Sequence, residues 1–85
     1  MTKDEIFVKY GTVPLWFSSY YKYVFTFRGV APDGTVICVS IGGSAEDIYR
    51  FSVERNEEVT LGAEYSYAMV SNADGEELWS ESNAW

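Results

Sequence analysis

The chain has 85 residues and a formal net charge of −7, with 47% hydrophobic and 18% aromatic residues. This apolar content is too high for a disordered segment, so we expect a single small domain over residues 1–85. Because the chain has one cysteine and no histidine, it lacks the commonest general base, a usual zinc ligand set and any intramolecular disulfide.

The N-terminal quarter holds one regular segment and one irregular one. We interpret residues 6–10 as a short opening strand. Residues 12–20 follow, and Pro14 excludes a central strand there because proline cannot donate a ladder hydrogen bond. Two alternatives remain: a short helix capped by Thr12, or a loop whose aromatic side chains are partly exposed.

The middle of the chain predicts a β-hairpin. Aromatic residues occupy every second position of residues 21–28, which is typical of a half-buried strand. Pro32, Asp33 and Gly34 then provide a tight turn. Residues 35–41 are apolar at nearly all positions, which favours a central strand that ends at the two glycines 42–43.

The second half of the chain predicts further short elements. We expect one helical turn at residues 44–47, where Ser44 is placed as an N-cap. Strands are expected at residues 49–53, 59–61, 65–70 and 78–79, and an Asp-Gly turn lies within residues 72–77. Residues 80–85 have no periodicity and are expected to fray. The fold class is therefore all-β: an antiparallel meander of about six short strands closing into a barrel or sandwich, with at most one or two helical turns.

The charge is distributed unevenly along the chain. Residues 1–42 carry four basic and three acidic side chains, a balance of +1, whereas residues 43–85 carry two basic and ten acidic ones, a balance of −8. Direct binding to nucleic acid is not expected, because phosphate neutralisation needs clustered lysine and arginine. Acidic side chains can simply keep a small domain soluble, or they can bind a basic partner, for which Glu54, Glu57 and Glu58 are the candidates.

Aromatic residues are concentrated between positions 10 and 23. Trp16, Phe17 and Tyr20 precede the regular alternation and are the candidates for partner contact, since tryptophan and tyrosine suit interfaces. The alternative is that a small all-β domain with few leucines fills its core with aromatic side chains.

These features favour a non-catalytic, acidic interaction module that binds a protein partner. We expect no enzymatic activity, no metal and no cofactor. Two alternatives are an acidic inhibitor that mimics nucleic acid, of the kind phages and mobile elements encode, and a small structural subunit of a larger assembly. The start of the chain has no signal-peptide pattern, and no apolar stretch approaches membrane-spanning length. We therefore expect a cytoplasmic protein without membrane contact; its oligomeric state stays open.

Overall fold

The structure, a computed structural model, describes residues 1–44, 46, 50 and 59–83. The strand predicted at residues 49–53 lies outside the described residues, and so does most of the helical turn predicted at residues 44–47.

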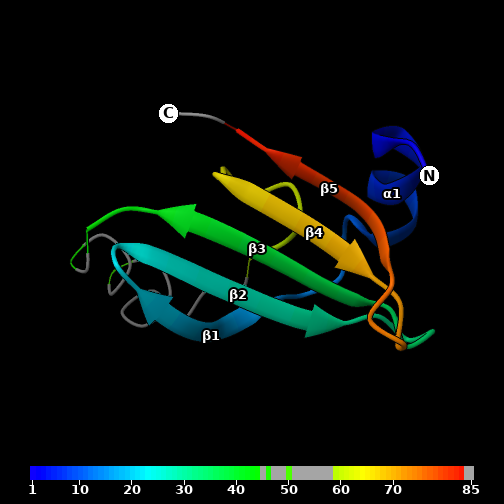
Figure 1. The fold of residues 1–85 in the computed structure, drawn as a ribbon, viewed down its shortest axis with the longest axis horizontal. Coiled ribbons are helices and arrows are strands. Elements are labelled where there is room, and N and C mark those ends of the chain that lie inside the picture. The colour runs from blue at the N-terminus through cyan, green and yellow to red at the C-terminus, as the bar shows by residue number, and fades with distance from the viewer. Residues whose placement is uncertain (45, 47–49, 51–58, 84–85) are drawn as a thin grey trace.

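The fold consists of a short N-terminal helix and an antiparallel sheet of five strands (Figure 1). The strands lie in the sheet in the order in which they occur in the chain. The elements are α1 (Lys3–Tyr10), β1 (Trp16–Tyr21), β2 (Val24–Val30), β3 (Val36–Gly42), β4 (Tyr67–Ser71) and β5 (Glu77–Ser82). The prediction of an antiparallel, mostly β meander is confirmed.

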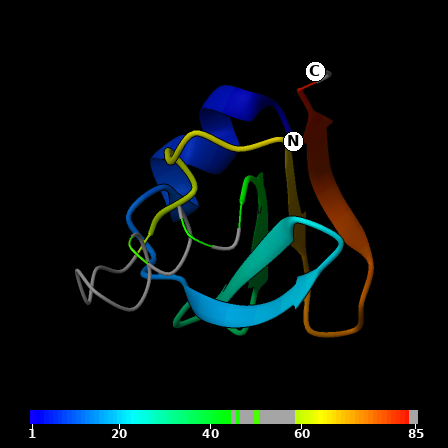
Figure 2. The same ribbon diagram turned by 90° about the vertical axis from the view of Figure 1, so that its left-hand side faces the viewer.

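The predicted closure into a barrel is wrong, and the described strands form one sheet, not the two sheets of a sandwich. β1 and β5 are the two edges of the sheet and do not pair with each other. Figure 2 shows α1 and the segment from residue 59 to 66 on one side of the sheet, and the described residues place no element on the other side. The sheet buries one face by means of a helix and a connecting segment, so its hydrophobic face is covered without closure.

The opening strand predicted at residues 6–10 is also wrong, because these residues belong to α1. A capping box starts the helix: the Glu5 amide donates to Thr2 Oγ1 at 3.2 Å, and the Thr2 amide donates to Glu5 Oε1 at 3.4 Å. Ile6 and Tyr10, one helical turn apart, are buried, whereas Val8 between them is 89% exposed. Because Ile6, Val8 and Tyr10 are apolar at every second position, the sequence pattern resembled that of a strand.

Residues 12–20 form neither a helix nor an irregular loop, since most of the segment belongs to β1. Pro14 precedes the strand, and Leu15 joins Val59 by two backbone hydrogen bonds of 2.8 and 3.1 Å. β1 is the edge strand at one side of the sheet, where a neighbouring proline costs no ladder bond. A register shift between Phe17 and Ser19 marks a β-bulge.

The strand predicted over residues 21–28 is interrupted near its start. β1 ends at Tyr21 and β2 begins at Val24. Lys22 and Tyr23 make the two-residue hairpin turn between them, with φ angles of 49° and 66°. A two-residue turn with both φ angles positive matches the twist of the flanking strands, but it usually carries asparagine and glycine.

The hairpin predicted from residues 28 to 43 is confirmed as β2, a turn and β3. Within the turn, Gly34 has a φ of 89°, and Asp33 Oδ1 accepts the Thr35 amide at 3.0 Å. The Asp-Gly turn between β4 and β5 is confirmed as well, with Gly75 at a φ of 86°. β5 extends through residues 80–82, beyond the strand predicted at residues 78–79. The fraying predicted for residues 80–85 is not tested by these observations.

The core lies between the covered face of the sheet and α1. Its most deeply buried large side chains come from all parts of the chain: Phe27, Ile6, Leu15, Ile37, Leu61, Val39 and Val70. Phe7 of α1 packs against Trp79 of β5 edge to face, with ring centroids 5.9 Å apart. The helix is thereby held over the β5 side of the sheet.

Two carboxylates link α1 to the sheet. Asp33 Oδ2 accepts the Tyr10 hydroxyl at 2.9 Å, and Lys9 Nζ lies 3.8 Å from the same oxygen. Glu81 Oε2 accepts the Tyr65 hydroxyl at 2.6 Å and pairs with Lys3 Nζ at 2.9 Å. Hydrogen bonds from the Thr35 amide lower the pKa of Asp33, and the Tyr65 hydroxyl followed by Lys3 lowers the pKa of Glu81.

These carboxylates make stability depend on acidity. A carboxylate whose pKa is lower in the folded than in the unfolded state stabilises the fold at pH values above its unfolded pKa. This stabilisation is lost as the pH falls through its folded pKa. We expect the melting temperature to fall as the pH drops below about 5, and to fall less in Asp33→Asn, which lacks one of the titrating groups. Calorimetry on both proteins tests this. Parallel pH profiles would contradict a role for Asp33.

Candidate interaction surface

Five exposed aromatic side chains lie along β1 and in its turn to β2. They are Trp16 (55% exposed), Phe17 (47%), Tyr20 (43%), Tyr21 (71%) and Tyr23 (67%), and together they form what we call the aromatic edge. The structure therefore places the three sequence candidates, Trp16, Phe17 and Tyr20, on one strand and exposes all of them. Tyr21 and Tyr23 extend the same surface to the tip of the hairpin.

The aromatic edge has two sides because neighbouring strand positions face opposite sides of the sheet. Phe17 pairs with Phe27, and Tyr20 pairs with Phe25. The ring centroids of Phe17 and Phe27 are 6.1 Å apart, and those of Tyr20 and Phe25 are 4.6 Å apart. Phe17 and Tyr20 thus extend the core outwards, with one side of each ring packed and the other exposed.

The exposed area of these five side chains is divided between the two sides of the sheet. At about 200 Å² for each aromatic side chain, the exposed fractions of the five correspond to about 550 Å² in total. Trp16 and Tyr21 lie on the side opposite Phe17 and Tyr20, so this total is spread around the strand and is not one contiguous patch. The alternative that aromatic residues only fill the core therefore holds for Phe25 and Phe27, which are 5% and 1% exposed, but not for the aromatic edge.

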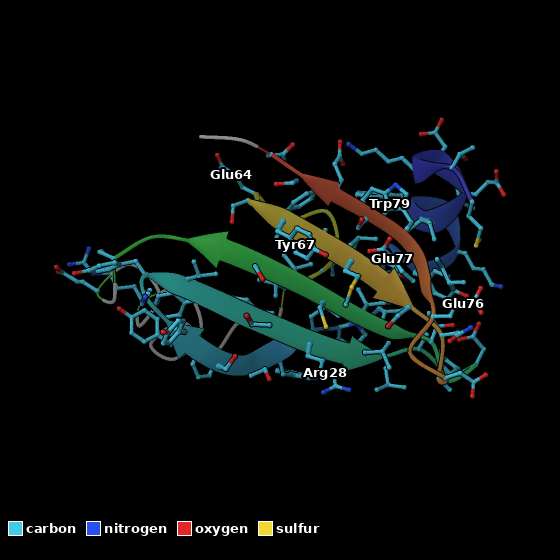
Figure 3. The ribbon with its side chains drawn as sticks, viewed as in Figure 1. Arg28, Glu64, Tyr67, Glu76, Glu77 and Trp79 are labelled. Atoms are coloured by element: carbon cyan, nitrogen blue, oxygen red, sulfur yellow. The ribbon has the colours of Figure 1, made fainter. Side chains whose placement is uncertain are left out.

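The uncovered side of the sheet is a second surface, which we call the open face. Its strand positions alternate with the buried ones, and the pairing of the strands aligns them in rows. The members are Trp16, Ser19, Tyr21, Val24, Thr26, Arg28, Val30, Val36, Cys38, Ser40, Gly42, Tyr67, Met69, Ser71, Glu77, Ser80 and Ser82. Arg28 and Glu77 are the charged residues among these described strand positions (Figure 3).

Cys38 lies in the middle of the open face, in register with Arg28 on β2 and with Met69 on β4. Partial burial raises the pKa of its thiol, and the positive charge of Arg28 offsets only part of this rise. The thiol is therefore protonated at neutral pH and is a poor nucleophile. Its position suits packing rather than chemistry.

The acidic residues fall into two groups, those outside the described residues and those within them. Glu54, Glu57 and Glu58 lie outside the described residues. Among the described residues, acidic side chains gather at the end of the sheet opposite the hairpin tip, because the β2–β3 and β4–β5 turns end there side by side (Figure 1). These are Asp33, Asp74, Glu76 and Glu77. None of these four residues was a candidate for partner binding from the sequence.

The described part of the chain contains no group of three or more histidine, cysteine, aspartate or glutamate side chains arranged to hold a metal ion. Its helices also include none with the length and hydrophobicity to cross a membrane.

Comparison with known proteins gives no relative. No family model matches the chain, and neither a curated protein nor a solved structure matches it.

Two parts of the surface were missed by sequence reasoning. Tyr21 and Tyr23 were assigned to one strand, because the turn formed by Lys22 and Tyr23 carries no glycine or asparagine that would mark it. The open face was missed because a pattern of alternation shows that two faces differ but not which one a helix covers. The capping box of Thr2 and Glu5 was the signal that could have revealed that helix.

Proposed function

We propose that this protein is a non-catalytic interaction module that binds a protein partner through its aromatic edge. The observation that carries the proposal is the exposure of five aromatic side chains on one strand and its turn. Tryptophan and tyrosine dominate the energetically important positions of interfaces, since they bury a large area and have few rotatable bonds. We propose further that the protein acts in the cytoplasm, without a cofactor and without binding nucleic acid or membranes.

The packing of the edge supports an anchoring role. Phe17 and Tyr20 are each held by a core ring on one side, so little conformational entropy is left to lose when a partner covers the other side. Pre-organised aromatic side chains of this kind bind through desolvation. We therefore expect the affinity for the partner to depend weakly on salt.

The test is a comparison of three proteins as bait in lysate of the native host. The variant Trp16→Ala/Phe17→Ala/Tyr20→Ala removes the three sequence candidates, and Val8→Ala removes an exposed apolar side chain of α1 as a matched control. We expect wild type and Val8→Ala to retain the same partner, and the triple variant to bind the isolated partner at least about 100-fold more weakly. Equal binding by all three proteins would remove the aromatic edge from the proposal.

A second candidate is the acidic inhibitor that presents carboxylates where phosphates would lie. The gathering of Asp33, Asp74, Glu76 and Glu77 at one end of the sheet favours it, because such a surface attracts basic proteins. This function predicts binding that weakens steeply with salt, and loss of binding on charge reversal of Glu54, Glu57 and Glu58 together with Asp74 and Glu76. If binding to every basic partner survives that reversal, this candidate is excluded.

A further inference from the structure

We propose that two copies of this chain pack open face to open face as a symmetric dimer. This inference goes beyond the proposed function, because apart from Trp16 and Tyr21 at its rim the open face is separate from the aromatic edge. It rests on three observations: the composition of the face, the placement of its charges and its size.

The composition of the open face is unusual for a surface in water. Antiparallel sheets with one solvated face normally alternate apolar residues inside with polar and charged residues outside. Here Cys38 and Met69 lie at the centre of the outer face, and Val24 and Val36 lie near its two ends, all partly buried by their neighbours. Many of the other positions carry serine or threonine, and Arg28 and Glu77 are the charged ones among the described strand positions. Methionine, arginine and aromatic residues are enriched in interface cores, whereas lysine and acidic residues are depleted.

The two charged positions of the face complement each other under two-fold symmetry. Arg28 lies on β2 and Glu77 on β5, three strands apart in the sheet, which corresponds to about 14 Å. A two-fold axis that lies between two facing sheets, midway between these residues, places Arg28 of each copy opposite Glu77 of the other. Such an interface is self-complementary, as a symmetric dimer requires.

The direction of that axis agrees with known sheet packing. Because Arg28 and Glu77 are separated mainly across the strands, the axis runs roughly along them. Glu77 also lies two residues, about 7 Å, further along the strands than Arg28. An axis tilted by about 15° from the strands makes the two sheets cross at about 30°, as in known face-to-face packing, and the long side chains of Arg28 and Glu77 span the remaining offset. Met69 and Cys38, which lie on the two central strands between the charged residues, come to the middle of the interface.

The size of the face predicts a dimer of moderate strength. Five strands spaced about 4.8 Å apart and five to seven residues long make a face of roughly 20 by 20 Å. With its side chains standing out from the sheet, this is at the lower end of the range for specific interfaces, about 600 Å² per partner. We expect a micromolar dissociation constant.

The remaining described acidic groups do not prevent this association. Asp33, Asp74 and Glu76 lie in the turns at the end of the sheet rather than at strand positions of the face. At about 0.15 M salt, exposed charges further apart than about 8 Å are largely screened. The experiment is therefore done at physiological ionic strength.

The test is the mass of the protein in solution, measured by sedimentation equilibrium over a range of concentrations. Arg28→Glu and Glu77→Arg each place like charges opposite one another at both ends of the interface, and we expect each to weaken the dimer at least about tenfold. The double variant Arg28→Glu/Glu77→Arg restores opposite charges, and we expect it to associate within about threefold of wild type. Circular dichroism verifies that every variant keeps its β fold.

Matched controls carry the same changes of net charge elsewhere. Asp4→Arg on α1 matches Glu77→Arg, and Lys22→Glu in the hairpin turn matches Arg28→Glu; both are expected to dimerise like wild type. A wild-type protein that is monomeric even at about 1 mM, the weak end of specific affinities, overturns the proposal. A double variant that associates no better than the single ones overturns it as well. The proposed function is tested separately by the binding of Phe17→Ala to the partner, because Phe17 lies on the covered side of the sheet and its removal leaves the open face intact.

Discussion

Replacing Phe27 with alanine is expected to lower the free energy of unfolding by about 3–5 kcal/mol, the usual range for truncating a buried phenylalanine. Phe27 is 1% exposed and lies in β2, between the edge strand β1 and the central strand β3. A domain of this length is stabilised by only about 4–12 kcal/mol in total. The variant is therefore expected to be partly or wholly unfolded at 37 °C, as measured by urea denaturation followed by circular dichroism.

Phe17→Ala is the matched control for this loss. Phe17 pairs with Phe27 across the two strands, but 47% of it is exposed. Its truncation removes about half as much buried area and leaves no enclosed cavity, so we expect a cost below about 1.5 kcal/mol. Phe17→Ala should therefore stay folded and lose partner binding. Equal destabilisation by the two substitutions would mean that Phe17 belongs to the core and not to an interaction surface.

Changing Lys22→Asn together with Tyr23→Gly is expected to stabilise the fold by about 1–2 kcal/mol, because side chains other than asparagine and glycine are strained at positive φ. Both residues of the turn have positive φ. The variant loses an exposed contact between Lys22 Nζ and the Tyr21 ring, at 5.3 Å, and the Tyr23 side chain, which is 67% exposed. A gain of this size raises the melting temperature of a small domain by roughly 5–15 °C in a thermal scan.

Gly75→Ala introduces backbone strain at a positive-φ position, whereas the hairpin variant removes it. Gly75 has a φ of 86°, and a Cβ added there would meet no atom within 4 Å. The substitution therefore measures the backbone penalty alone, and we expect a loss of about 1–2 kcal/mol. If Gly75→Ala were neutral while the hairpin variant gained stability, backbone strain would not be the reason for the gain.

The hairpin turn also relates stability to function. The chain has glycine at a positive-φ position in the β2–β3 and β4–β5 turns but keeps lysine and tyrosine in the β1–β2 turn. The β1–β2 turn keeps strained backbone at Lys22 and Tyr23, and it lies within the exposed aromatic edge. This favours a functional reason for keeping these two side chains. We expect the more stable variant to bind the partner of the aromatic edge more weakly.

Much of the sheet could be predicted from the sequence, because period-two alternation is a direct consequence of burying one face. Phe25 with Phe27 and Ile37 with Val39 follow this rule, and the Asp-Gly turns were marked by the residue type their backbone needs. The helix was not predicted, because Ile6, Val8 and Tyr10 are apolar at alternate positions, as in a strand. The capping residues Thr2 and Glu5 are what distinguish a helix from a strand here. Closure was not predictable from the number of strands.

The candidate surface was predictable in part. The exposure of Trp16, Phe17 and Tyr20 was one of two alternatives, and the structure decides for exposure. The position of Glu77 beside Ser71 depends on a bulge in β5, which no local pattern marks. The pairing of Arg28 and Glu77 on one face therefore emerges only from strand register.

The order of the strands has a consequence for the route by which the chain folds. Neighbours in the sheet are also neighbours in the chain, and three of the four pairings, β1–β2, β2–β3 and β4–β5, are closed by turns of a few residues. Only β3 and β4 are joined by a long connection, residues 43–66. Local pairings form quickly, whereas closing a long connection costs chain entropy first. The slow event in assembly is therefore the meeting of a three-stranded half with a two-stranded half along β3.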